Sequence, residues 1–367
     1  MTPTVDPARL LGLLDEIAGS RIVVAGDLLA DQFIYGEITR VSREAPVLIL
    51  NYDSTEVVPG GAGNAAANVA ALGGVARAAG RVGRDEAGRR LLGALRQRKV
   101  DVTQVIRPSD YRTPTKTRIL AGGIHSAKQQ VVRIDRATTS AVDERTRAAF
   151  EARVLRACRG ADALLISDYG SGLVTPSLVA KARRVLQQAP VIVDSRYALP
   201  KFRGMTACTP NESEVEQALG IRINDNLRLL ERAGRELLDR TKMRAVLITR
   251  GSRGMALFVQ KTPTLHIPIY GSDEIADVTG AGDTVMAAMA LALAAGATFE
   301  LAARLANYAG GLVVMKRGTA TVSAAELTAA VRADRAVASA PPRGRSSDRP
   351  GKQRRGRSSD RPERRRG

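Results

Sequence analysis

The chain has 367 residues, of which 44% are hydrophobic, a length and composition typical of a soluble globular protein with one large or two ordinary domains. Its two cysteines exclude a disulfide framework, and its two histidines leave little material for a histidine metal site or a Ser-His-Asp triad. Part of the net charge of +19 lies in residues 341–367, which hold 11 basic and 3 acidic side chains. Because this segment lacks apolar residues, we predict a disordered basic tail over 335–367, which is either a solvated extension or a contact for RNA or an anionic surface.

The first 19 residues are predicted to form an amphipathic helix, and they lack the basic start and the cleavage site of a signal peptide. A cytoplasmic protein is therefore expected. No apolar run is long enough to span a membrane, which needs about 20 residues. Residues 21–33 follow with an apolar strand that ends in Gly26 and Asp27, and Asp31 comes four residues later. Acids at the carboxyl end of a strand lie where open α/β sheets bind ligands.

Two stretches predict a small sheet apart from the main one. Residues 33–60 and 113–136 are rich in β-branched residues, alternate in polarity and contain short turns. We expect them to form a lid made of strands. Since an exposed lid offers free strand edges to a second copy of the chain, it also predicts a homodimer.

Between these stretches, GGAGNAAANVAALGG at 60–74 predicts a glycine turn followed by an alanine-rich helix. Asn64 and Asn68 lie one turn apart on one face of that helix. The glycines also fit the spacing of a dinucleotide-binding turn. No apolar strand leads directly into the first glycine, however, which argues against such a site.

From residue 75 onward, apolar strands alternate with helices, which predicts parallel β-α-β units and a doubly wound, mainly parallel α/β sheet within one domain over 1–334. Five buried strands end in a polar residue: Asp27, Asp168, Asp194, Asn211 and Thr249. Each of these is individually consistent with a turn former or a helix cap. Because parallel strands end at one edge of their sheet, together they predict a cleft.

The stretch DVTGAGDTVMAAMALALAAG at 277–296 predicts a tight turn at Gly280 and Gly282 that opens into an apolar core helix. The first turn of a helix presents free N–H groups and the positive end of the helix dipole, which together favour phosphate. Asp283 stands at this helix start. It is either the helix N-cap or a reacting carboxylate.

Taken in order, PGGAGNAAANVAALG, ISDYGSGLV, CTPNESEVE, LITRGSRGMALF and DVTGAGDTV resemble the ribokinase-like (PfkB) carbohydrate kinases, over about residues 10–333. The segment from Tyr35 to Pro46 resembles in particular the heptose-7-phosphate kinases of that family. The resemblance implies ATP-dependent phosphorylation of the anomeric hydroxyl of D-glycero-D-manno-heptose 7-phosphate, on the route to ADP-heptose and lipopolysaccharide. The alternatives are another sugar or nucleoside kinase, for ribose, fructose or adenosine, and a nucleic-acid-binding protein that acts through its tail.

The resemblance also assigns roles to residues. Asp283 matches the catalytic base, while the N–H groups of Gly280, Ala281 and Gly282 are expected to stabilise charge on the transferring phosphoryl group. Glu214 matches a residue that helps to hold Mg²⁺ and its waters, and a monovalent cation is a further candidate ion. The ATP-binding positions are matched by Asp194, Arg196, Asn211, Glu214, Thr249, Arg250, Gly251 and Asn307.

Sugar-binding positions are matched by Asp27, Asp31, Gly60, Gly61 and Asn64, and carboxylates and amides suit hydroxyl groups. The candidates for the substrate phosphate are Arg40, Arg43, Lys116 and Arg133, each of which is otherwise a solvated charge of the lid. Arg196 stands where the heptose kinases have a lysine, so it either replaces that lysine or marks a change of specificity. No nucleotidyltransferase motif follows the kinase segment, and a separate enzyme is expected to use the product.

Overall fold

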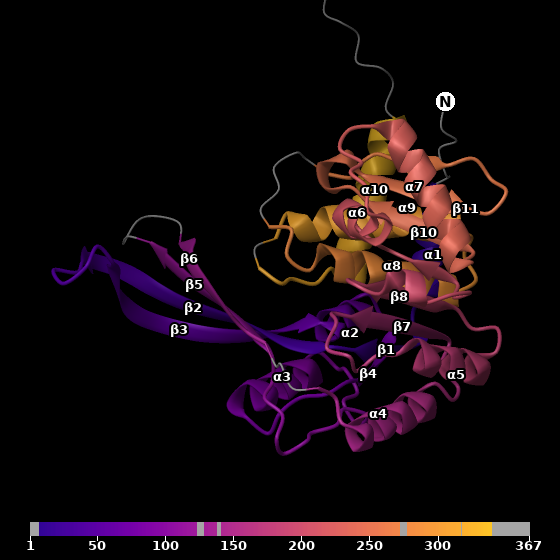
Figure 1. Cartoon of the computed structure of the whole chain (residues 1–367). Coiled ribbons are helices and arrows are strands. Elements are labelled where there is room, and N and C mark those ends of the chain that lie inside the picture. The colour runs from indigo at the N-terminus through magenta and orange to yellow at the C-terminus, as the bar shows by residue number, and fades with distance from the viewer. Residues whose placement is uncertain (1–6, 123–127, 138–140, 272–276, 317, 340–367) are drawn as a thin grey trace, which may run out of the picture.

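The computed structural model describes residues 7–122, 128–137, 141–271, 277–316 and 318–339. Its body has three layers, a central sheet with helices on both faces (Figure 1). Within the described residues the sheet has eight strands, in the order β12-β11-β10-β9-β8-β7-β1-β4. Their bounds are β1 (Arg21–Gly26), β4 (Val75–Ala79), β7 (Ala163–Asp168), β8 (Val191–Ser195), β9 (Ala207–Cys208), β10 (Ala245–Thr249), β11 (Met255–Val259) and β12 (Leu265–Ile267).

The sheet is mainly parallel, as predicted, and only β11 and β12 at one end pair antiparallel with their neighbours. Successive residues of its strands face opposite hydrophobic clusters. In β1, Ile22 and Val24 pack into one cluster, whereas Val23 and Ala25 pack into the other. Burial on both faces explains why these strands are uninterrupted apolar runs in the sequence.

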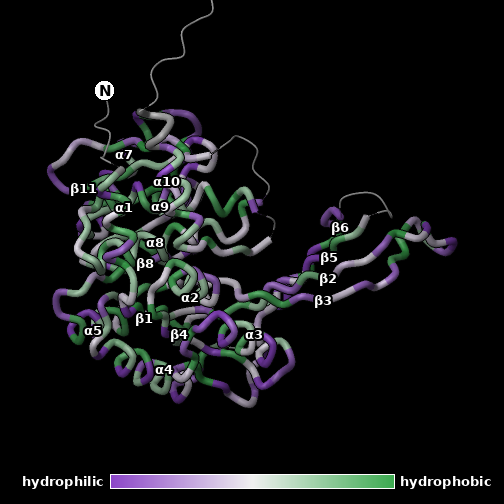
Figure 2. Tube along the Cα trace, turned by 180° about the vertical axis from the view of Figure 1, so that it is seen from behind, coloured by the Kyte–Doolittle hydropathy of each residue, from purple (hydrophilic) through white to green (hydrophobic). Residues whose placement is uncertain are grey.

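Helices cover both faces of the sheet. One face carries α1 (Pro7–Glu16), α2 (Ala62–Ala71), α3 (Glu86–Gln97), α8 (Ala281–Ala294), α9 (Phe299–Val314) and α10 (Ala324–Ser339). The other carries α4 (Glu144–Ala157), α5 (Pro176–Leu186), α6 (Glu212–Leu219) and α7 (Leu227–Thr241), and two short 3-10 helices span Leu199–Lys201 and Gly251–Arg253. Since α8 contacts α2, α9 and the sheet, it is buried on nearly all sides, which explains its apolar sequence. Figure 2 shows the hydrophobic residues gathered in these layers.

The predicted lid is a second sheet, which projects from the body (Figure 1). Its strands, in the order β3-β2-β5-β6, are β3 (Leu48–Gly61), β2 (Leu28–Val41), β5 (Thr115–Gly122) and β6 (Gln129–Arg136). The central pair, β2 and β5, is parallel, and the outer pairs are antiparallel. The lid thus joins the two predicted stretches through a parallel pairing that neither stretch contains alone.

The first core strand ends at Gly26, as predicted, but the lid begins at Leu28 and so earlier than the predicted residue 33. The chain leaves the main sheet at Asp27, whose N–H donates to the Ser167 carbonyl while its own carbonyl accepts from the Ala62 N–H. These two bonds divert the backbone from β1 into β2. As a consequence, Asp31 belongs to the lid and not to the end of a core strand.

The C-terminal part adds α9 and α10, in a region where the sequence analysis predicts no element. Because α10 continues to Ser339, the predicted start of the tail at residue 335 lies inside this helix. The remainder of the predicted tail, 340–367, lies outside the described residues. Within the described part of the chain, every helix is too short or too polar to cross a bilayer.

Candidate active site

The carboxyl ends of the parallel strands meet at one edge of the main sheet. In the strand register, Ser167 lies between Gly26 and Asp194, and Asn211 bridges to Thr249. The polar strand ends therefore converge, as predicted. They border a cleft of about 490 Å³ that is also lined by the start of α8 and by Lys116 of the lid.

Asp283 lies in the first turn of α8 and lines this cleft. The helix N-cap is Gly280, so the alternative that Asp283 is the N-cap is wrong. The residue is 4% exposed, and its carboxylate accepts hydrogen bonds from Asn64 Nδ2 at 3.0 Å and from the Tyr169 hydroxyl at 3.4 Å. Burial raises the pKa of Asp283 to about 7, although the Asn64 hydrogen bond lowers it. A carboxylate with such a pKa is suited to accept a proton near neutral pH.

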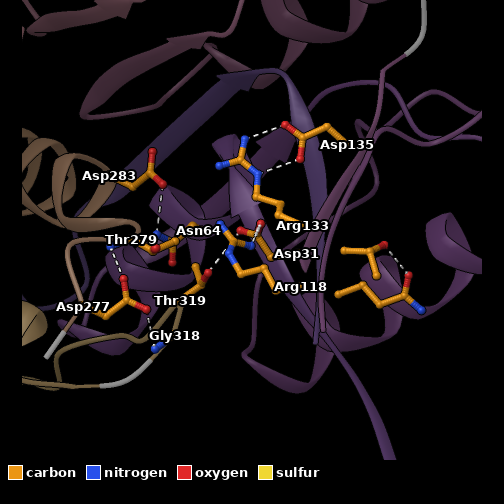
Figure 3. Close-up of polar contacts among 12 residues, drawn as sticks. Asp31, Asn64, Arg118, Arg133, Asp135, Asp277, Thr279, Asp283, Gly318 and Thr319 are labelled. Carbon is orange, nitrogen blue, oxygen red and sulfur yellow. Dashed lines mark hydrogen bonds and ion pairs between the residues drawn. The ribbon is translucent and has the colours of Figure 1, made fainter. Parts of the chain in front are cut away.

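Asn64 reaches Asp283 from α2 and also contacts the turn before α8 (Figure 3). Its Nδ2 donates to the Gly280 carbonyl at 3.3 Å, and its Oδ1 accepts from Asn68 Nδ2 at 3.2 Å. Gly280 has φ +80°, and a Cβ there would lie 2.5 Å from Asn64 Nδ2. Only glycine satisfies both conditions. The two predicted glycine turns thus meet around a single carboxylate.

Asp31 lies on the lid side of the same region, where Arg118 holds it from the neighbouring strand (Figure 3). Arg118 Nη1 donates to Asp31 Oδ1 at 2.7 Å, and Thr319 Oγ1 donates to Asp31 Oδ2 at 3.1 Å. A Cβ at Gly60 would lie 2.5 Å from Asp31 Oδ2, and Gly61 is the N-cap of α2. These contacts explain how a carboxylate is accommodated at a position that is almost fully buried.

Asp27 lies between the main sheet and the lid, next to the residues that line the cleft. Its Oδ2 accepts from the N–H groups of Tyr169 at 2.8 Å and Ser171 at 3.3 Å, and its Oδ1 accepts from the Ser171 hydroxyl. Burial raises the pKa of Asp27, and these hydrogen bonds lower it. The loop after β7 is therefore fastened to this carboxylate.

The basic residues predicted to bind phosphate divide into two groups. Lys116 lines the cleft, with its Nζ 5.2 Å from the centre of the Tyr169 ring, and burial lowers the pKa of Lys116. The charges of Arg133 and Arg196 lower the pKa of Lys116 further, so these three cations lie in one region. Arg133 Nε also donates to Asp135 Oδ1 at 2.7 Å.

Arg40 and Arg43 form the second group, and both are exposed outside the cleft lining. Arg40 is near the end of β2, and Arg43 is in the loop that follows. Because a strand rises about 3.3 Å per residue, Arg40 lies about 30 Å along β2 from Asp31. The structure does not bring this pair of arginines to the cleft of their own chain.

Two acids face the other half of the cleft. Asn211 caps α6 and forms a capping box with Glu214, whose Oε2 accepts from the Asn211 N–H at 2.9 Å. Asp194 of β8 lies beside Ser167 of β7, and its buried Oδ1 has no hydrogen-bond partner among the described residues. Burial, followed by the charge of Glu214, raises the pKa of Asp194 well above its ordinary value, and burial also raises the pKa of Glu214.

This pair fits a cation that is shared with a ligand. Within the described residues, no cluster of His, Cys, Asp and Glu is sufficient to hold a metal ion by itself. Mg²⁺, however, commonly binds through one or two carboxylates together with phosphate oxygens and water. An unpartnered carboxylate oxygen beside a second acid provides such a partial set of ligands.

The remaining predicted ATP positions have different surroundings. Thr249, Gly251, Arg196 and Asn307 line the cleft, and Asn307 Nδ2 donates to the Pro268 carbonyl at 2.9 Å. Arg250 does not line it, because its Nε donates to Glu212 Oε1 at 3.0 Å. The Arg250 side chain therefore stabilises the junction of β10 and α6.

Several residues that line the cleft or hold its neighbours are not among the predicted positions. Arg118 and Thr319 hold Asp31, Tyr169 contacts Asp283, and Gly310 and Gly311 of α9 line the cleft wall. The sequence pattern could have indicated Arg118, because it follows Lys116 by two residues on a predicted strand. The two side chains therefore lie on the same face of the sheet. Thr319 had none, since it contacts Asp31 from the far end of the chain.

Comparison with known proteins extends this description. The family model for "pfkB family carbohydrate kinase" matches residues 20–326. The bifunctional protein HldE of Geobacter sulfurreducens is 42% identical over 316 residues, which are 83% of this chain and 61% of that protein. HldE of Caulobacter vibrioides is 42% identical over 318 residues, 85% of this chain and 63% of that protein. The chain thus spans about three fifths of the length of these relatives.

Solved structures agree on the fold. Ribokinase of Arabidopsis thaliana, complexed with ribose and ATP, superimposes with a TM-score of 0.65 at 21% identity. The match covers 86% of this chain and 99% of the ribokinase chain. Phosphofructokinase-2 of Escherichia coli, in complex with potassium, superimposes with a TM-score of 0.69 at 21% identity and the same coverage. The three-layer body and the projecting lid are thus a ribokinase-like fold.

Proposed function

Because the chain belongs to the pfkB family of carbohydrate kinases, we propose that it transfers the γ-phosphoryl group of ATP to the anomeric hydroxyl of D-glycero-D-manno-heptose 7-phosphate. The product is the 1,7-bisphosphate, on the route to ADP-heptose. The observation that carries this proposal is Asp283, a buried carboxylate with a pKa of about 7 at the start of α8, facing the cleft. The 42% identity to HldE proteins and the segment from Tyr35 to Pro46 support the choice of sugar.

The proposed reaction is a transfer of the phosphoryl group from ATP to the sugar hydroxyl. The anomeric hydroxyl gives its proton to the Asp283 carboxylate, its oxygen forms a bond to the γ-phosphorus, and the bond from that phosphorus to the β,γ-bridging oxygen breaks to release ADP. In this proposal the N–H groups at the start of α8, those of Gly280, Ala281 and Gly282, stabilise charge on the transferring group. Asp27 and Asp31 bind sugar hydroxyls from the lid side.

Asp194 and Glu214 would hold Mg²⁺ on the nucleotide side, through water and phosphate oxygens. Bound Mg²⁺ neutralises phosphate charge during transfer. Dependence on a monovalent cation is proposed as well, and comparing activity in potassium chloride with activity in tetramethylammonium chloride tests it. The potassium complex of phosphofructokinase-2 supports this second ion.

For the phosphate already on the sugar, we propose Lys116 and Arg133, because the charge of Arg133 acts on Lys116 at the lid side of the cleft. Replacing Lys116 by Met should raise KM for the phosphosugar at least about tenfold, because a phosphate would lose one charge-assisted contact. KM for ATP should stay within about twofold. Arg40→Met is the matched control, since Arg40 lies far from the cleft along β2. An equal rise of KM in both variants would contradict this subsite.

A homodimer through the lid is also proposed. Several apolar side chains of the lid are exposed in the single chain: Val41, Leu48, Tyr52, Val132 and Ile134. Pairing between two lids would bury these side chains and would place basic lid-tip residues next to a second copy. The protein is expected to act in the cytoplasm, and contact of the basic tail with nucleic acid or an anionic surface concerns residues outside the described structure.

A substrate panel tests the proposed function. The full-length protein is incubated with ATP, Mg²⁺ and, separately, heptose 7-phosphate, ribose, fructose or adenosine, and ADP release and the phosphorylated product are measured. Heptose 7-phosphate should give the 1,7-bisphosphate with the highest kcat/KM. Turnover of only the unphosphorylated acceptors would contradict the proposal.

A further inference from the structure

Tyr169 connects three residues in or beside the cleft that come from distant parts of the chain. Its hydroxyl donates to Asp283 Oδ1 at 3.4 Å, its N–H donates to Asp27 Oδ2 at 2.8 Å, and its ring lies 5.2 Å from the Lys116 Nζ. It directly follows Asp168, the last residue of β7, so its backbone is fixed by the main sheet.

The Asp283 carboxylate therefore accepts a hydrogen bond at each of its two oxygens. Asn64 Nδ2 donates to Oδ2 at 3.0 Å, and the Tyr169 hydroxyl approaches Oδ1. Among the described residues, each oxygen has one protein donor, which leaves an acceptor site on the carboxylate for the proton of the sugar hydroxyl. With only the Asn64 bond, the carboxylate plane would be free to rotate about that contact.

We propose that Tyr169 is a positioning residue, which fixes the orientation of the Asp283 carboxylate through its hydroxyl and sets it relative to the Asp27 side of the cleft through its backbone. This inference rests on the proposed role of Asp283 as base, and it does not depend on which sugar is the acceptor. The 3.4 Å separation is long for a hydrogen bond. Such contacts in ligand-free sites commonly tighten when substrate binds.

The charges around Asp283 make this orientation consequential. Asp31 faces it from β2, Lys116 from β5 and Asp194 from β8. Two of these three neighbours are acids, which disfavour a negative charge on Asp283. The Tyr169 hydroxyl opposes them, because its hydrogen bond stabilises the charged form and lowers the pKa of Asp283.

Tyr169→Phe isolates the hydroxyl, because phenylalanine keeps the ring beside Lys116 and the N–H bond to Asp27. The matched control is Tyr308→Phe, since the Tyr308 hydroxyl also donates to a carboxylate, that of Asp334, but does not line the cleft. Both full-length variants are assayed for kcat, for KM of each substrate and for the pH dependence of kcat/KM.

In Tyr169→Phe, kcat should fall about tenfold, the value of one hydrogen bond to a charged group, while KM for ATP stays unchanged. The acidic limb of kcat/KM should move to higher pH, because loss of the hydrogen bond raises the pKa of Asp283. Tyr308→Phe should leave both unchanged. An unshifted acidic limb in Tyr169→Phe, whether or not kcat falls, would overturn the inference, as would an equal shift in the control.

A measurement without substrate separates this inference from the proposed function. Infrared difference spectra of the ligand-free protein against Asp283→Asn report protonation of the Asp283 carboxyl group as pH varies. The same difference, taken in the Tyr169→Phe background, should titrate at higher pH. If the wild-type protein does not phosphorylate heptose 7-phosphate, the proposed substrate fails, and the infrared titration still decides the role of Tyr169.

Discussion

Replacing Asp283 by Asn should abolish turnover and at the same time make the protein more stable at alkaline pH. The loss of activity should reach at least about 10³-fold, because the sugar hydroxyl loses its proton acceptor, while ATP binding is retained. The gain in stability follows from burial. The carboxyl group has an ordinary pKa of 3.8 and a pKa of about 7 in the folded protein, so the folded state disfavours its charged form.

The sign and size of the effect depend on pH. Below pH 3.8 the group is protonated in both states and costs nothing, and the destabilisation grows as pH rises, becoming complete above pH 7. A difference of about three pKa units corresponds to about 4 kcal/mol at pH 8 and about 2 kcal/mol at pH 5. These are upper limits, because the new amide would have to make its own hydrogen bonds with Asn64 and Tyr169.

Thermal unfolding of both proteins at pH 5 and pH 8 measures this. The rise in Tm from Asp283→Asn should be several degrees at pH 8 and clearly smaller at pH 5. Asp85→Asn is the control of opposite sign: despite burial, hydrogen bonds from Thr113 and Gly88 lower the pKa of Asp85, so its loss should destabilise the protein at pH 8. If Asp283→Asn gives the same change in Tm at both pH values, burial of a charged carboxylate is not the cause.

Three further changes have expected outcomes. Gly280→Ala should reduce kcat at least about tenfold and lower Tm, because a side chain at φ +80° would push away the Asn64 amide that contacts Asp283. Gly282→Ala is the control in the same melting experiment. It should keep a near-normal Tm, because the space around its Cβ position is open. Arg118→Met leaves Asp31 as an unpaired buried charge, so it should destabilise the protein by about 3–5 kcal/mol in denaturant titration and raise KM for the sugar; an unchanged unfolding midpoint would contradict the ion pair. Ile134→Asp on the lid should convert a dimer to a monomer in light scattering, and a dimer that persists would exclude this surface as the interface.

Periodicity predicted the body of the protein because its strands are buried on both faces. An apolar run such as Ile22 to Ala25 has no other stable environment than the middle of a layered sheet. The polar residues that end these runs converge for the same reason, since parallel strands share one edge. Asp283 was predicted as the base only together with the other motifs, and its position inside α8 removed the alternative of a cap.

The remaining features depend on contacts between distant parts of the chain. The parallel pairing of β2 with β5 places Arg118 against Asp31, and no local pattern specifies which strands of a lid pair. The diversion of the chain at Asp27 comes from backbone bonds to Ser167 and Ala62, which sequence alone does not indicate. The prediction that Arg40 and Arg43 bind the substrate phosphate rests on the chemistry of arginine. That chemistry does not reveal how far along a strand a residue lies.

The passage of β1 into β2 joins the main sheet to the lid. In the proposed function, the strands of the lid recognise the acceptor, whereas strand ends and helices of the body bind the phosphoryl donor. On this proposal, mutations in the lid can change which sugar is accepted without changing the residues that transfer the phosphoryl group. The corresponding experiment is to transfer residues 28–61 and 115–136 from one family member to another while the body is left unchanged.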